Sequence, residues 1–150
     1  MRELPWLLMA LAMGALLPLQ TVANASLRSG LGSTATLATL VSFIGGTLVL
    51  AVASLLQPGG VAPLARLAQQ PGWQLLGGPI GACFLFGMTF LAPRLGLTAL
   101  LSLVIAGQLF VSLGIDRLGL GALAARSVGP MQIAGAALVV VGVLLVNAGR

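Results

Sequence analysis

Residues 97–115 read LTALLSLVIAGQLFVSLGI, an unbroken run without a charged side chain that stops at Asp116 and Arg117. The hydrocarbon core of a bilayer is about 30 Å thick, and a helix needs roughly 20 predominantly apolar residues to cross it. The run has this length and this composition. It therefore predicts a transmembrane helix, and the rest of the chain can be read outward from it.

Four further apolar runs of similar length lie on either side of this one. Glycine, proline and polar residues separate them, and Pro93-Arg94-Leu95-Gly96 predicts a tight turn before residue 97. In a longer connection, Ala62–Gln70 predicts one or two turns of helix at the membrane surface, with Leu64 and Leu67 toward lipid. We therefore predict one all-α domain, residues 1–150, with five transmembrane helices. The expected spans are about 4–25, 34–56, 73–92, 97–115 and 131–148.

The composition of the whole chain favours the same class of protein. Apolar residues make up 59% of the 150 residues and charged residues only 6%, whereas an average soluble domain has roughly 25% charged residues. The net charge of +5 does not indicate nucleic-acid binding, because the arginines lie singly between apolar runs and form no basic patch. Arginine at the end of a span is typical of anchoring in lipid headgroups.

The first run also has features of a cleaved secretory signal. Arg2 precedes an apolar stretch, and Ala23-Asn24-Ala25 has the small-x-small form of a cleavage site. Four more spans follow, so we expect this run to be retained as a transmembrane helix.

The chain lacks the side chains on which catalysis and metal binding depend. It has no histidine, a single cysteine (Cys83) and two acids, Glu3 and Asp116, which lie at the ends of spans. Hydrolysis inside a membrane needs a nucleophile with a base, a pair of carboxylates or a metal ion. The sequence therefore predicts no enzymatic activity, no metal site and no cofactor.

Polar side chains inside the spans are the candidate solute contacts, because they are costly in hydrocarbon and usually face the bundle or a cavity. Gln20 and Asn24 lie one turn apart on one face of the first span. Ser42 shares a face of the second span with Thr39, and Gln108 is the only carboxamide near the middle of any span. We predict a solute site lined by Gln20, Asn24, Ser42 and Gln108. The alternative is hydrogen bonding between helices that only holds the bundle together, and it is stronger for the hydroxyl face of the second span.

Asp116 and Arg117 form a charged pair at the end of the fourth span. Asp116 is the one acid placed to couple transport to protons, since Glu3 precedes the first span and is expected to be solvated. A carboxylate beside an arginine at a helix end is expected to stay ionised. We therefore favour a structural ion pair over a proton-coupling site.

The arginines give almost no instruction about orientation in the membrane. With five spans the termini lie on opposite faces, and an excess of Lys and Arg marks the cytoplasmic side. One face carries four arginines and the other three: Arg2, Arg66, Arg117 and Arg126 against Arg28, Arg94 and Arg150. Either one arginine or a partner selects a single orientation, or copies insert both ways and pair head to tail.

Several short motifs along the chain match those of a known family. They are Gln20-x-x-x-Asn24-Ala25-x-Leu27, Pro93-Arg94-Leu95-Gly96, Ile105-Ala106-Gly107-Gln108-Leu109, and Ile115-Asp116 with Gly119. On these motifs the chain resembles the YdcZ family of five-helix bacterial membrane proteins, relatives of the drug/metabolite transporter superfamily. The likeness covers essentially the whole chain. Arg117-Leu118 departs from the family pattern, which has histidine and an aromatic residue there.

The resemblance implies a small-solute transporter of the bacterial inner membrane. Members of the family occur as single genes with balanced charge, as gene pairs of opposite bias, or as fused double-length chains, which implies an antiparallel homodimer of ten helices. Its partners would be a second copy, membrane lipid and a small-molecule solute, and it would work by alternating access between the two halves. Two alternatives remain open: a passive dual-topology channel, and a scaffold subunit of another membrane complex.

Overall fold

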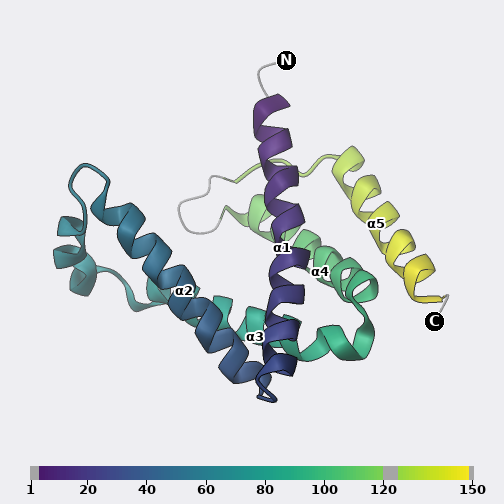
Figure 1. Ribbon diagram of the computed structural model, residues 1–150. Helices are drawn as coiled ribbons and strands as arrows, with labels where there is room; N and C mark the ends of the chain where they lie inside the picture. The colour runs from purple at the N-terminus through teal and green to yellow at the C-terminus, as the bar shows by residue number, and fades with distance from the viewer. Residues whose placement is uncertain (1–3, 120–124, 149–150) are drawn as a thin grey trace. The chain divides into compact units, whose positions relative to one another are not determined.

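The computed structural model describes residues 4–119 and 125–148, and this part of the chain is helical without any strand (Figure 1). Five helices within these described ranges are long and apolar enough to cross a membrane, so the prediction of an all-helical membrane protein with five such helices is confirmed. The chain divides into two compact units, of which the first ends at Pro93 and the second begins at Arg94. The helices are α1 (Leu4–Gly30), α2 (Ala35–Leu55), the 3₁₀ helices η1 (Ala62–Gln69) and η2 (Gly72–Leu76), α3 (Gly77–Leu95), α4 (Leu97–Leu118) and α5 (Pro130–Ala148).

Three helices run beyond the ends that the sequence predicted. α1 continues past residue 25 to Gly30, and Gly32, with φ of 54°, reverses the chain just after it. Pro93–Leu95 continue α3 instead of forming a turn, so Gly96 alone, with φ of 71°, separates α3 from α4. α4 ends at Leu118 before Gly119 in the left-handed conformation. In each case the break falls at a glycine with positive φ, a backbone conformation that other residues rarely adopt.

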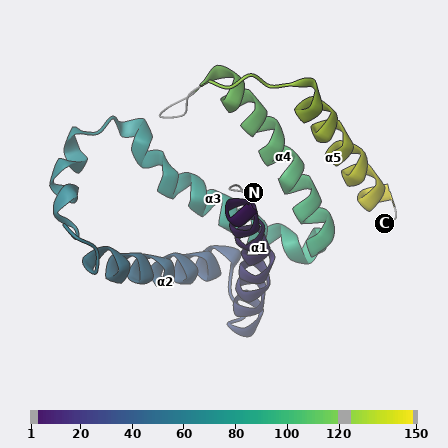
Figure 2. The same cartoon turned by 90° about the horizontal axis from the view of Figure 1, so that it is seen from above.

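The first unit is built on a helical hairpin of α1 and α2, whose ribbons meet in Figures 1 and 2. Thr34 caps α2 by accepting a hydrogen bond from the backbone N–H of Leu37 at 3.3 Å. Thr21 of α1 is fully buried, as is Ala38 of α2. Small side chains let two helices approach closely, and this contact is what positions the polar residues of the hairpin.

α3 approaches α2 in the same unit near Gly81. The ring of Phe43 of α2 lies beside Gly81: a Cβ added to the glycine would lie 3.5 Å from the ring, an ordinary van der Waals contact. Leu85, Met88 and Thr89 of α3 are buried.

The 3₁₀ helix η1 has three residues per turn, which places Leu64 and Leu67 in one row along its surface.

The second unit is the pair α4 and α5, which lie side by side in both views (Figures 1 and 2). Ala99 and Leu100 of α4 and Ala136 and Val143 of α5 are its buried apolar residues. The spacing of seven residues between Ala136 and Val143 puts both on one face of α5. That face is therefore the one that α5 uses within this unit.

Candidate functional site

The structure brings two of the predicted site residues together across the α1–α2 hairpin. Asn24 of α1 is 2% exposed, and the hydroxyl of Ser42 of α2 donates a hydrogen bond to its Oδ1. The bond occupies one of the two lone pairs of the carboxamide oxygen and fixes the orientation of the group. The two N–H bonds on Nδ2 of Asn24 are left for another partner.

Within the part of the chain that the structure describes, the hairpin also holds the buried side-chain atoms that lack a hydrogen-bond partner. Among residues 4–119 and 125–148, three buried side-chain atoms lack a hydrogen-bond partner: Asn24 Nδ2, Ser33 Oγ and Thr39 Oγ1. All three belong to α1, α2 or the turn between them. An unpaired buried polar group costs about 1–3 kcal/mol, so such groups are rare unless a ligand or a water completes them. Among the described residues, the α1–α2 hairpin therefore offers the buried hydrogen-bonding groups that a ligand could pair with.

Thr39 differs from the other buried threonines in how its hydroxyl is used. Thr21 and Thr89 each donate to the carbonyl four residues earlier in the helix, at 2.8 Å and 2.9 Å. Thr39 is 6% exposed, yet its hydroxyl makes no such bond. Sequence reasoning treated Thr39 as part of a packing face, and the composition of α2 gave no signal to separate it from its neighbours.

The other two predicted site residues are both exposed. Gln20 lies one turn before Asn24 on α1, but its side chain is exposed and has no hydrogen bond within the described part of the chain. Gln108 is also exposed and lies on α4, in the second unit. Its backbone carbonyl accepts a hydrogen bond from the hydroxyl of Ser112 at 2.7 Å. For Gln20 and Gln108 the role in a solute site stays a prediction.

A second asparagine–serine contact was not predicted. Nδ2 of Asn147 in α5 donates to the carbonyl of Val143 at 2.8 Å and to the hydroxyl of Ser102 in α4 at 3.4 Å. That hydroxyl in turn donates to the carbonyl of Ala99 at 2.8 Å. The contact ties α5 to α4. Ser102 and Asn147 are 45 residues apart, so no helical spacing in the sequence relates them.

The predicted ion pair of Asp116 and Arg117 is not formed. Both residues are described, and no salt bridge joins them, because neighbours in a helix point in different directions. What Asp116 supplies is its backbone carbonyl, which accepts from the N–H of Arg126 at 2.7 Å. Gly119 permits the return of the chain: its φ is 65°, and a Cβ on it would lie 2.6 Å from the backbone nitrogen of Ala125.

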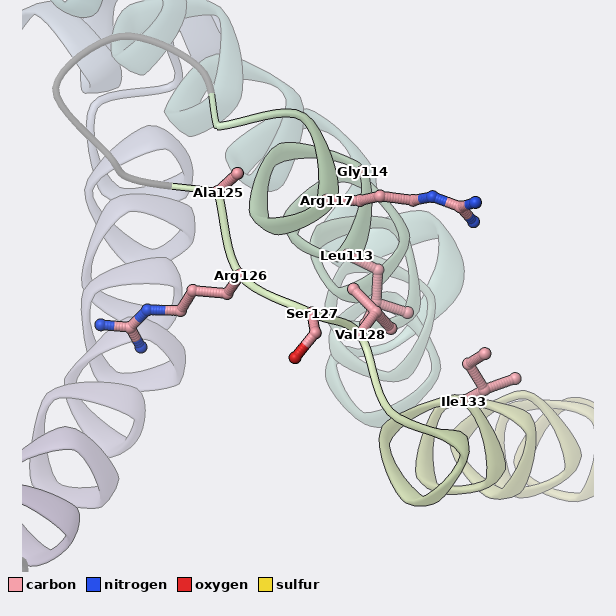
Figure 3. A pocket seen from close by; sticks show the side chains of 8 residues that line it. All are labelled: Leu113, Gly114, Arg117, Ala125, Arg126, Ser127, Val128 and Ile133. Carbon is pink, nitrogen blue, oxygen red and sulfur yellow. The ribbon is translucent and has the colours of Figure 1, made fainter.

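A cavity of about 720 Å³ lies beside this return, with Arg117, Arg126 and Ser127 among its lining residues. Two arginines around a cavity are a potential anion site, but only if they converge. Figure 3 shows their side chains pointing to opposite sides. The arrangement therefore does not form an anion-binding cradle, and it leaves the α1–α2 hairpin as the candidate site.

Comparison with known proteins gives one family match, and it is to a membrane protein family, in line with the five helices that could cross a membrane. Residues 5–145 match the model of the family described as "Putative inner membrane exporter, YdcZ". Comparisons with curated proteins and with solved structures gave no match. The matched range includes the α1–α2 hairpin and all the residues that the sequence predicted to line a site.

Proposed function

Because the chain belongs to the YdcZ family of inner membrane exporters, we propose that it carries a small solute by alternating access as an antiparallel homodimer. The protein is a multi-pass membrane protein with five helices able to span the bilayer. Membership of this family assigns it membrane transport in general terms. The proposal adds three things to this: a small solute, an antiparallel dimer and the alternating-access mechanism. It also proposes that the protein is a carrier and not an enzyme.

The observation that carries the proposal is the carboxamide of Asn24. It is buried, its oxygen is held by Ser42, and its N–H groups have no acceptor among the described residues. A donor that is already oriented and dehydrated binds an acceptor oxygen without further ordering of the side chain. Polar groups of this kind within the bundle are where secondary transporters bind their solutes. Gln20 and Gln108 remain the predicted residues that complete the lining in the dimer.

Support for the dimer comes from the charge balance and from α5. Four arginines against three leave insertion nearly undirected, which suits a chain that occurs in both orientations. On α5, a Cβ added to Gly135 or Gly142 would meet nothing within 4 Å, although Ala136 and Val143 on the neighbouring face are buried. The glycine face is thus open to another helix, and in the proposal that helix belongs to the second copy.

The test is solute flux through the purified full-length protein in proteoliposomes. A panel of organic anions, neutral amides, organic cations, amino acids and sugars is measured by counterflow, with protein-free vesicles as the control. We expect saturable exchange of at least one class and no single-channel currents in planar bilayers. Currents without saturation would replace the carrier with a passive channel. Neither flux nor current for any class would contradict the proposal and favour the scaffold alternative.

A further inference from the structure

α2 and α3 border an open, mainly apolar cavity of about 380 Å³ within the first unit. Phe43 and Phe86 line it, and the hydroxyl-bearing residues Thr36 and Thr39 lie on its α2 side. Small-molecule sites typically have a volume of about 300–1,000 Å³ and combine apolar walls with a few polar groups. The cavity has this volume and these apolar walls within the first unit alone, and its polar contribution would come from the hydroxyl of Thr39, which is buried beside it.

Of the unpaired hydrogen-bonding groups described in the hairpin, the hydroxyl of Thr39 belongs to a residue that lines the cavity. This residue lines the cavity, and its hydroxyl lacks a partner in the described part of the chain. Three residues further along α2, Ser42 holds Asn24, whose Nδ2 is also unpaired. Along α2, the apolar walls of the cavity therefore occur together with one unpaired hydroxyl, that of Thr39, and Asn24 of α1 lies close to α2 through Ser42. A solute with an apolar body and an acceptor oxygen would use both.

The charges of residues 4–93, the described part of this unit, disfavour a cation. Residues 4–93 contain Arg28 and Arg66 but no Asp or Glu, so a positively charged solute would find no counter-charge there. A buried charge without a partner is strongly unfavourable in a medium of low polarity. Hydroxyl and amide donors instead stabilise an acceptor oxygen, either that of a neutral carbonyl or that of a carboxylate whose charge is partly offset by the hydrogen bonds it accepts.

On the premise of the transport function proposed above, we propose that the cavity between α2 and α3 binds the apolar body of the solute. The solute is then a small amphiphile that carries a carboxylate or amide oxygen and no positive charge. Thr39 donates to that oxygen when its hydroxyl turns toward the cavity. Phe43 and Phe86 contact the apolar part and set its size.

The chain contains the probe for this proposal. Cys83 is its single cysteine, is exposed, and lines the cavity. The purified full-length protein is alkylated with N-ethylmaleimide, and the rate is followed by intact mass. Four compounds are compared: benzoate, benzamide, benzyltrimethylammonium and acetate. A compound at twice its dissociation constant leaves about one third of the sites free, so benzoate and benzamide should slow alkylation about threefold. Benzyltrimethylammonium lacks the acceptor and acetate lacks the apolar body, so neither should have an effect.

Two threonine variants separate the hydroxyl from the shape of the cavity. Thr39→Val keeps the branched side chain but removes the donor, and it should raise the benzoate concentration needed for protection about tenfold. Thr89→Val is the matched control, because the hydroxyl of Thr89 already donates to the backbone carbonyl of Leu85. This substitution should leave protection unchanged. Each variant must elute as a single peak and react without ligand at the wild-type rate, since unfolding would accelerate alkylation.

The outcomes distinguish this inference from the proposed function. Equal protection by benzyltrimethylammonium, or protection by none of the four compounds at millimolar concentration, would overturn the inference, while flux of another solute would leave transport standing. Protection that arises only on reconstitution into lipid would assign the cavity to an acyl chain and would also overturn it. Protection by benzoate and benzamide without any flux would support the binding site and contradict transport.

Discussion

The α1–α2 pair and the α4–α5 pair are each joined by one asparagine and one serine, but the two contacts run in opposite directions. Ser102 donates its proton to the carbonyl of Ala99 and can therefore accept from Asn147. Ser42 donates to the carboxamide oxygen of Asn24, and the nitrogen of that carboxamide is left over. The direction of one serine hydroxyl thus decides which part of the asparagine side chain bonds within the helix pair. Where the serine accepts, the asparagine N–H groups are bonded within the pair. Where the serine donates, they are left for a ligand.

The largest effect is expected from fixing the orientation of each copy, which tests whether two hairpins must face one another in an antiparallel dimer. Two lysines added within residues 59–70 raise that face from four positive charges to six, and two added at the C-terminus raise the other face from three to five. Each change should lock one orientation, as C-terminal reporter fusions would show. Either variant alone should lose transport, and coexpression should restore it.

The locked variants have a clear contradictory result. If one of them transports at the wild-type rate when expressed alone, parallel copies suffice. The antiparallel dimer would then have to be abandoned, although the contrast between the two asparagines would stand.

The next largest effect concerns the asparagines themselves. Asn24→Ala should lower transport by about tenfold to a hundredfold, because it removes the free donor. Asn147→Ala should leave the rate per folded molecule unchanged but cost about 1 kcal/mol of stability, which is the scale of a side-chain hydrogen bond between membrane helices. Counterflow rates and urea unfolding in detergent measure the two quantities. A reversed pattern, with flux lost only in the Asn147 variant, would break the comparison.

A smaller effect is expected at the end of α4, where a glycine lets the chain return toward α5. Gly119→Ala should destabilise the protein by about 1–3 kcal/mol, because alanine is strained at positive φ and its Cβ would meet the backbone of Ala125. Gly114→Ala is the matched control: it lies within α4 with open space around it, and it should be neutral or stabilising. Equal losses in both variants would show that α4 does not tolerate alanine for some other reason.

The smallest effect is expected at Asp116. Its carboxylate makes no ion pair with Arg117, and the contact to Arg126 uses its backbone carbonyl, which a substitution leaves in place. Asp116→Asn should therefore keep the transport rate within about twofold of the wild-type rate. Arg117→Gln should have an equally small effect. Flux with and without an imposed pH gradient is the measurement. Loss of gradient-driven flux in the Asp116 variant alone, with solute binding retained, would identify this acid as the proton carrier.

Much of the architecture is predictable from the chain because a bilayer leaves few options. Apolar runs that match the bilayer thickness must form helices there, since only helices and closed barrels satisfy their backbone groups in lipid. The misplaced helix ends have one cause. Proline and arginine were read as breakers near residues 93–96, whereas Gly96 alone adopts the positive φ that interrupts the helices. Sequence composition does not show which residue of the Pro93–Gly96 segment takes that conformation.

The sequence by itself determined the class of protein, the five helices and the presence of a carboxamide at position 24, because these depend on local composition and length. The tertiary structure decided the partners. Asn24 meets Ser42 across 18 residues and Asn147 meets Ser102 across 45, through the packing of helices that no spacing rule relates. The tertiary structure also decided that the hydroxyl of Thr39 stays unpaired beside a cavity while those of Thr21 and Thr89 do not. Side-chain rotamers and helix contacts set these hydrogen bonds, and both are properties of the packed chain.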